Sequence, residues 1–173
     1  KPLIPKGHLV AWAQFKLPIY RKPIITNPSE LSAINLFKND KGIEIYGQGF
    51  KAIFSRESGQ LSQYSVDGID LIKSPAEAHL WRAPTDNDLG NGMPERTALW
   101  KYAGSRMKTK ILYGSLKNNT AEIIIINLDS LSSTTLTSTY HVYGNGAIKV
   151  KQKIEIEDSL HSEMPRFGMK FDM

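Results

Sequence analysis

The residues best suited to chemistry lie in one stretch, between positions 79 and 92. It holds a tryptophan, an arginine, two aspartates, two asparagines and two glycines. Sugar recognition uses this combination, because hydroxyl groups need polar partners and the C–H face of a pyranose packs on an aromatic ring. The candidate sugar-binding residues are therefore Trp81, Arg82, Asp86, Asn87, Asp88, Gly90 and Asn91.

The same residues also suit a purely structural role. Asp and Asn side chains bond back to the local backbone in turns, and Arg82 could pair with one of the aspartates. The Asp-x-Asp spacing of Asp86 and Asp88 also suggests calcium, but the later bidentate glutamate of a calcium loop is absent. The structural and sugar-binding interpretations both remain open, and we expect no metal site.

Other reactive side chains have no catalytic context. The four histidines lack ligand spacing, and the absence of cysteine excludes disulfides, thiolate metal sites and cysteine nucleophiles. No apolar run approaches the roughly 18–20 residues of a membrane helix. The net charge is +5, but Lys149, Lys151 and Lys153 alternate as on the solvated face of a strand. We therefore expect neither a membrane nor a nucleic-acid partner.

Short alternating runs separated by glycine turns predict the elements that position this stretch. The run at 121–128 is almost continuously apolar and predicts a strand buried on both faces. At 147–157 isoleucine and valine alternate with charged residues, and Asp67-Gly68 is a hairpin turn. Strands are expected at 43–46, 50–55, 61–66, 69–72, 107–113, 121–128, 134–143 and 147–157.

One helix is expected after the candidate loop. Pro94 suits its first position and Gly104 its C-terminal cap, with Leu99, Tyr102 and Ala103 on the buried side. Many short strands and little helix argue for a mainly β protein, an antiparallel β-sandwich with one short helix. The proline-rich start differs: residues 8–17 are interpreted as one strand of a preceding domain, followed by a linker.

The sequence Trp81-Arg82-Ala83-Pro84-Thr85-Asp86-Asn87-Asp88-Leu89-Gly90 resembles the Arg-Ala-Pro-x-Asp-Asn-Asp-x-Gly signature of β-galactosidases of glycoside hydrolase family 2. In that family the signature opens the small-chain, C-terminal domain. Shorter matches follow the family's order at 7–15, 58–61, Trp100, Gly104 and 165–169. The resemblance divides the chain into 1–28, the final strand of an immunoglobulin-like domain and linker, and 29–173, the N-terminal part of a truncated, galactose-mutarotase-like supersandwich.

The resemblance implies an enzyme that removes terminal β-galactose with two glutamates, as retaining glycosidases do. Both belong to a catalytic barrel of the same polypeptide, so this chain should hold no catalytic residue and be inactive alone. Its loop would complete the rim of the galactoside pocket, and Gly90 and Gly92 would let residues 89–94 move as a flap. The family's metal ions bind elsewhere, so no cofactor is expected in this chain.

Two other functions compete with this one. The first is a free-standing carbohydrate-binding or interaction module, and the second is a mutarotase-like epimerase, which needs a His/Glu pair in the sandwich cleft. Because an incomplete sandwich leaves an open edge or an exposed apolar face, it would also invite homo-oligomerisation. The compartment is left open between periplasm and cytoplasm.

Overall fold

The structure is a computed structural model that describes residues 4–9, 11, 13–15, 17–19, 27–157 and 163–173, and it confirms the antiparallel β-sandwich. After a 3-10 turn, η1 (Pro28–Glu30), one sheet has the order β1-β2-β3-β4-β5, with β1 (Asn35–Asn39), β2 (Gly42–Gly47), β3 (Phe50–Ser55), β4 (Gln60–Val66) and β5 (Ile69–Asp70). The second sheet has the order β10-β9-β8-β7, with β7 (Lys108–Lys117), β8 (Thr120–Asp129), β9 (Thr134–Tyr143) and β10 (Ile148–Ile156). A third, small sheet pairs β6 (Glu77–His79) with β11 (Gly168–Lys170).

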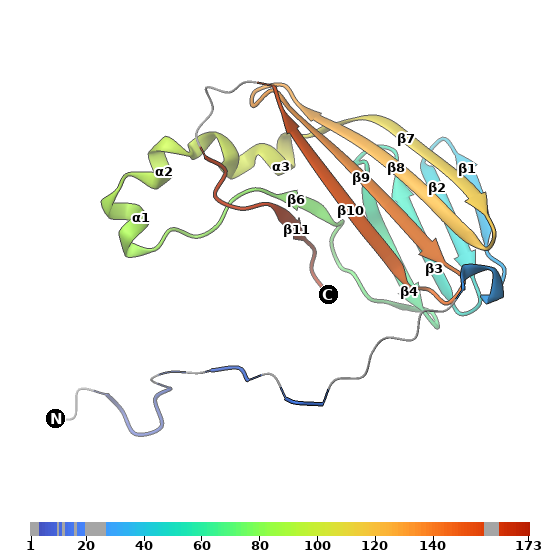
Figure 1. Cartoon of the computed structure of the whole chain (residues 1–173), viewed down its shortest axis with the longest axis horizontal. Helices are drawn as coiled ribbons and strands as arrows, with labels where there is room; N and C mark the ends of the chain where they lie inside the picture. Colours follow the sequence, from blue (N-terminus) through green and yellow to red (C-terminus); the bar gives the residue numbers. More distant parts are fainter. Residues whose placement is uncertain (1–3, 10, 12, 16, 20–26, 158–162) are drawn as a thin grey trace.

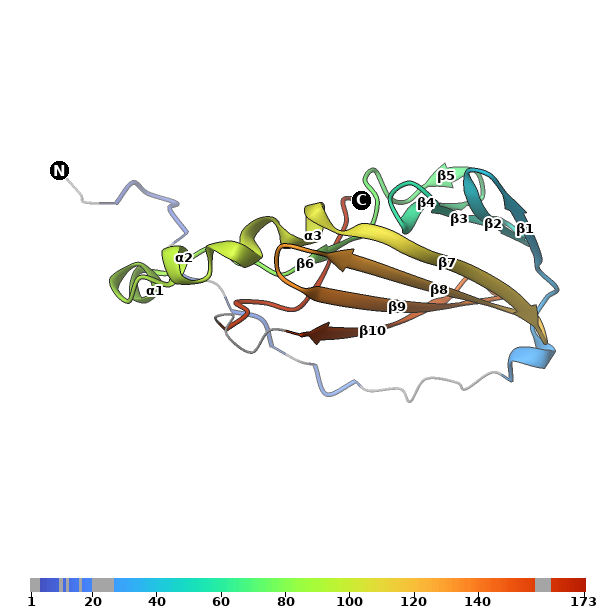
Figure 2. The same cartoon turned by 90° about the horizontal axis from the view of Figure 1, so that it is seen from above.

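The core lies between the two larger sheets, which face each other in Figure 2. Alternating residues of β2 and β3 meet alternating residues of β8 and β9, and the rings of Phe54 and Tyr140 contact edge to face at 4.9 Å between centroids. The core thus takes every second residue of each strand, including β8, which was predicted from a continuous apolar run. The expected strand at 69–72 is shorter, since only Ile69–Asp70 pairs with β4.

β8 is less buried than expected, and β7 does not follow a simple alternation of burial. β8 is buried on one face only: Ile123 and Ile125 are fully buried, whereas Ile124 and Ile126 are half-exposed. In β7 the register shifts between Thr109 and Ile111. This irregularity turns Ile111 outward, and the burial pattern of the strand no longer follows strict alternation.

The single helix expected at 94–104 is instead three short segments: α2 (Met93–Arg96), the 3-10 segment η2 (Ala98–Tyr102) and α3 (Ala103–Arg106). A further short helix, α1 (Asp86–Gly90), precedes them within the candidate loop. Tyr102 is 60% exposed, not buried. The buried positions are Met93, Thr97, Trp100, Ala103 and Gly104, which still follow helical spacing. The buried face is thus offset by about one position from the expected one.

The N-terminal segment is described in part. Val10, Trp12 and Lys16, which belong to the strand expected at 8–17, lie outside the described residues, as does His161. The described residues of 8–17 belong to no strand, because a strand requires a hydrogen-bonded neighbour and the sheets of the described part begin at Asn35.

Candidate functional site

The candidate loop runs from β6 into α1 and α2, which project at the end of the molecule away from β1 and β2 (Figure 1). Thr85 begins α1 through a capping box: its side chain accepts from the backbone N–H of Asp88, and the Asp88 carboxylate accepts from the backbone N–H of Thr85. The aspartates and asparagines that sequence analysis placed in an irregular loop therefore form one short helical turn.

Arg82 and Asp88 hold this turn together. The two side chains form a bidentate ion pair, in which Arg82 Nη1 contacts Asp88 Oδ2 and Nη2 lies 2.8 Å from Oδ1. Asp88 Oδ2 also accepts from the backbone N–H of Thr85 at 2.7 Å and from its hydroxyl at 2.8 Å. Both carboxylate oxygens of Asp88 are thus occupied within the protein, as the structural interpretation expected.

The electrostatics of Asp88 follow from these contacts. Hydrogen bonds from Arg82, and then from the backbone and hydroxyl of Thr85, hold the pKa of Asp88 well below its ordinary range. The hydrogen bond to Asp88 in turn raises the pKa of Arg82. The pair is therefore ionised at any physiological pH and serves as a fixed support, not as a proton donor.

A second apolar cluster lies beneath the helical segments. Leu80 and Trp100 are each 1% exposed and Ala103 is fully buried, with Trp81 half-buried against them. Gly104 makes this packing possible, because a Cβ atom there would lie 2.0 Å from the carbonyl oxygen of Ala78 in β6. Of the candidate residues, Trp81 is therefore partly committed to packing and remains partly exposed.

The remaining polar candidates lie on the surface. Asp86, Asn87 and Asn91 are exposed, and within the described part of the chain their side chains make no hydrogen bond or ion pair. The candidate set thus divides into supporting residues, Arg82 and Asp88, and free polar groups held on the outer side of one turn. Such groups can donate to and accept from hydroxyls without first breaking a protein contact.

Sequence analysis missed the attachment of this turn to the C-terminal segment. Arg96 donates to the carbonyl oxygen of Asn91 at 2.8 Å, and its guanidinium contacts the Glu163 carboxylate at 3.0 and 2.6 Å. No local pattern could have indicated a pair 67 positions apart. Between α1 and α2, Gly92 has a φ of +67°, a conformation that favours glycine, whereas Gly90 lies in open space at the end of α1.

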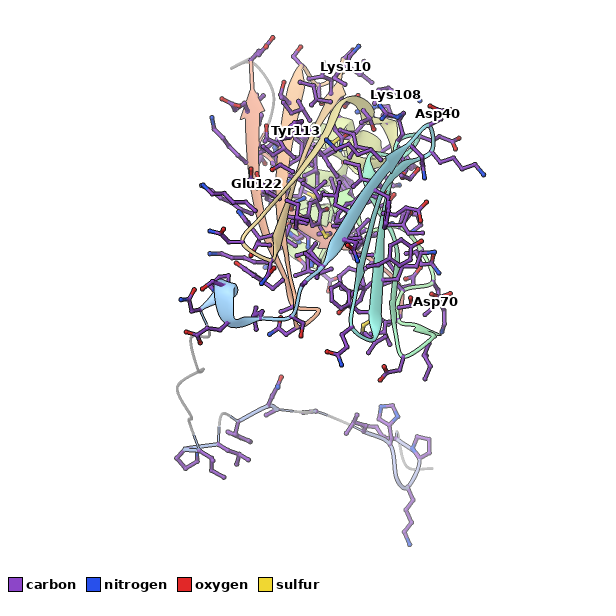
Figure 3. The ribbon with its side chains drawn as sticks, turned by 90° about the vertical axis from the view of Figure 1, so that its right-hand side faces the viewer. Asp40, Asp70, Lys108, Lys110, Tyr113 and Glu122 are labelled. Atoms are coloured by element: carbon purple, nitrogen blue, oxygen red, sulfur yellow. The ribbon has the colours of Figure 1, made fainter. Side chains whose placement is uncertain are left out.

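A mutarotase-like epimerase needs a His/Glu pair in the sandwich cleft, and the described residues place no such pair there. His141 and Glu122 do form a pair, 3.2 Å apart, but they lie half-exposed on the outer surface of the four-stranded sheet. Glu122 is labelled on that surface in Figure 3. The described ranges also contain no group of three or more His, Asp or Glu placed to hold a metal ion, and no described helix is long and apolar enough to cross a membrane.

Comparison with known proteins gives consistent matches. Residues 46–173 match the family described as "Beta galactosidase small chain". A beta-galactosidase of Priestia megaterium is 29% identical over 170 residues, covering 96% of this chain and 16% of that protein. One of Clostridium acetobutylicum is 31% identical over 171 residues, covering 97% and 18%, and one of Streptococcus thermophilus is 29% identical over 168 residues, covering 96% and 16%. The chain spans less than a fifth of the length of these relatives.

Proposed function

The chain belongs to the β-galactosidase small-chain family, and on that premise we propose that it is a non-catalytic β-sandwich segment of a retaining β-galactosidase. In this proposal the sandwich packs on a catalytic barrel of the same polypeptide, and its helical turn completes the rim of the pocket for a terminal β-galactoside. The relatives that the chain resembles along nearly its whole length are all named as beta-galactosidases.

The rim proposal rests on one observation: the polar residues of the loop divide into a supporting ion pair and free polar groups. Arg82 and Asp88 fix the turn through a bidentate pair, while Asp86, Asn87 and Asn91 leave their polar groups free on its outer side. A binding rim needs this arrangement, because groups held in place before binding lose less conformational entropy when a ligand arrives. The half-buried ring of Trp81 adds an aromatic surface beside the turn.

The chemistry itself is proposed to lie outside this chain. Retaining hydrolysis needs two carboxylates about 5–5.5 Å apart, one as nucleophile and one as acid/base. The resemblance places both glutamates in the barrel, and no glutamate of this chain has a matching sequence context. The purified chain should therefore not turn over nitrophenyl β-galactoside, and measurable turnover that copurifies with it would contradict the proposal.

The rim is tested in a full-length enzyme that carries this segment. Asp86→Asn and Asn87→Ala should each lower kcat/KM by roughly tenfold, the value of one hydrogen bond to the substrate. The matched control is Asp40→Asn, an exposed aspartate in the β1–β2 turn (labelled in Figure 3), which should leave kcat/KM unchanged. If all three variants have the same kcat/KM, the turn does not contribute to the galactoside pocket.

The flap proposal has its own test. Gly90→Ala adds a methyl group that would meet nothing within 4 Å, so it changes the freedom of the backbone without disturbing the packing. We expect a change in substrate KM or in kcat in the full-length enzyme, with a melting temperature that is not lowered. Unaltered steady-state kinetics would show that residues 89–94 do not move during turnover.

A further inference from the structure

The tripeptide Gly-Asn-Gly occurs twice in the chain, at residues 90–92 and at residues 144–146. Asparagine is a chemically labile residue, and a glycine after it has no side chain to hinder its backbone nitrogen from reaching the asparagine side chain. The first copy lies in the turn between α1 and α2, and the second in the turn between β9 and β10. Because both asparagines have the same immediate neighbours, a difference in their reactivity has to come from the tertiary structure.

The reaction in question is deamidation through a succinimide, which needs no enzyme. Hydroxide removes the proton from the glycine backbone N–H, and that nitrogen attacks Cγ of the asparagine side chain. The new N–Cγ bond closes the ring as the Cγ–Nδ2 bond breaks, and the Nδ2 group takes up a proton from water and leaves as ammonia. Water then opens the ring at either of its two carbonyl carbons, which gives aspartate or isoaspartate. The sum consumes one water and releases one ammonia.

The reacting groups of the first copy are accessible. The Asn91 side chain is exposed and makes no hydrogen bond or ion pair within the described part of the chain. A Cβ atom at Gly92 would meet, among the described residues, only the Glu95 carboxylate at 3.9 Å, so the peptide nitrogen of Gly92 is not enclosed. Its N–H donates to the carbonyl oxygen of Leu89 across 3.2 Å. Attack on Cγ therefore displaces one long hydrogen bond and no packed side chain.

The same groups of the second copy are held in place. The Asn145 side-chain oxygen accepts from the backbone N–H of Ala147 at 3.1 Å, which fixes the asparagine side chain. Gly146 is buried, and its N–H donates to the carbonyl oxygen of Tyr143 at 2.9 Å. Its own carbonyl oxygen accepts from the Tyr64 hydroxyl at 2.7 Å. Ring closure at Asn145 must therefore break several hydrogen bonds and distort a hairpin turn that packs on the sandwich.

The backbone around Asn91 also moves more easily. The flanking helices α1 and α2 are only 5 and 4 residues long, and helices of that length are not stable by themselves. Arg96 Nη1 donates to the carbonyl oxygen of Asn91 at 2.8 Å, but the Arg96 side chain is 44% exposed, and interactions of exposed charged side chains contribute little stability. The rotation that brings the Gly92 nitrogen to Cγ of Asn91 is therefore weakly opposed.

We propose that Asn91 is a site of spontaneous deamidation, and that the identical tripeptide at 144–146 is protected by its hairpin. The product carries a negative charge in the turn that Arg96 contacts, and isoaspartate also adds a carbon to the main chain between α1 and α2. If Asn91 lines the pocket rim as proposed above, the change further replaces an amide that can donate to a hydroxyl with a carboxylate that only accepts.

The test follows the purified 173-residue chain at mildly alkaline pH by mass spectrometry of its proteolytic peptides. The peptide that holds Asn91 should gain the mass difference between OH and NH2, and the gain should form faster as the pH rises. The peptide that holds Asn145 should react roughly tenfold more slowly, because freeing its side chain costs about one further hydrogen bond. Asn91→Gln, which would need a larger ring, should remove the fast reaction, whereas the matched control Asn145→Gln should leave it unchanged.

A second measurement separates the fold from the local sequence. In concentrated denaturant the two tripeptides lose their different surroundings, so their rates should converge, and Asn145 should account for most of that change. The proposal is overturned by equal rates at the two asparagines in the folded chain, by a faster reaction at Asn145, or by the absence of any mass gain at Asn91. A ratio of rates that denaturant leaves unchanged would overturn it as well, because the hairpin would then protect nothing.

Discussion

The sandwich core lies between two regular sheets, whereas the cluster around Trp100 lies beneath four short helical segments. In the sandwich, strand after strand contributes alternate side chains such as Phe54, Ile123 and Val142, all fully buried. The smaller cluster has three fully buried members, Leu80, Trp100 and Ala103. It therefore depends much more on polar ties to the rest of the molecule.

Those ties are specific ion pairs. Arg106 of α3 contacts Asp129 at the end of β8, at 3.1 and 2.7 Å, and also donates to the carbonyl oxygen of Leu99. At the other end of the segments, Arg82 holds Asp88. The difference teaches that the sheets supply most of the apolar burial, while charged pairs fix the position of the turn that presents the candidate binding residues.

The largest expected effect comes from removing one large side chain from each region. Phe54→Ala and Trp100→Ala should each lower the free energy of unfolding by about 3–5 kcal/mol. Phe54→Ala should destabilise the whole molecule, whereas Trp100→Ala should act first on residues 86–107. Amide hydrogen exchange measures this: β8 and β9 should keep their protection in Trp100→Ala. Equal loss of protection throughout would show that the two regions unfold as one.

A smaller effect is expected from the close contact between α3 and β6. Gly104→Ala places a methyl group against the backbone oxygen of Ala78 and should cost about 1–3 kcal/mol, because backbone cannot move aside as a side chain can. Chemical denaturation followed by tryptophan fluorescence is the measurement, since Trp81 and Trp100 both report on this cluster. Gly90→Ala, which meets open space, is the matched control and should change the midpoint little.

Loss of the N-terminal cap of α1 should have a smaller effect on stability. Thr85→Ala removes the side chain that caps α1 and should cost about 1 kcal/mol. The loss should be confined to the turn, so that far-UV circular dichroism of the sheets is unchanged while the exchange of amides 86–91 becomes faster. Thr135→Ala, on the outer face of β9, is the control with no cap to lose. A control as damaging as Thr85→Ala would contradict a capping role.

The smallest effect on stability near neutral pH is expected from the ionisation of Asp88 and Asp129. Burial raises the pKa of Asp129, but hydrogen bonds from Arg106 and Ser132 outweigh it and lower the pKa below its ordinary value, as Arg82 and Thr85 do for Asp88. The stability from both groups is therefore fully present above the unfolded pKa of about 3.9 and is lost as pH falls through the lowered folded values. Melting temperature should stay flat from neutrality to about pH 5 and fall below about pH 4, and Asp129→Asn should reduce that fall.

Much of the sandwich could be predicted because its signals are local. Hairpin turns such as Asp67-Gly68 and the strand-forming residues along β3 and β9 predict strand limits without knowledge of any partner. The structure departs from the local patterns at positions whose burial depends on distant parts of the chain. Ile111 turns outward because of an irregularity in its pairing with β8, and Ile124 is half-exposed because nothing in the described residues fully covers that face.

The loop illustrates the same division at the site. Residue types predicted a polar, aromatic-bearing turn and allowed two roles for its aspartates, but they could not assign those roles. Asp88 became a support because its carboxylate lies within reach of both Arg82 and Thr85, whereas Asp86, two positions earlier, points to solvent. The attachment of Arg96 to Glu163 joins residues too distant for any local pattern to indicate.

The amino-acid sequence by itself determined the class of fold, most of the strands and the family signature between Trp81 and Gly90, because alternation, turn propensity and motif spacing are properties of neighbouring residues. Only the tertiary structure decided which polar groups of that signature are occupied and which remain free. It alone also gave the two Gly-Asn-Gly tripeptides different surroundings. Burial and ion pairing depend on residues brought together from distant parts of the chain, and sequence spacing does not encode those distances.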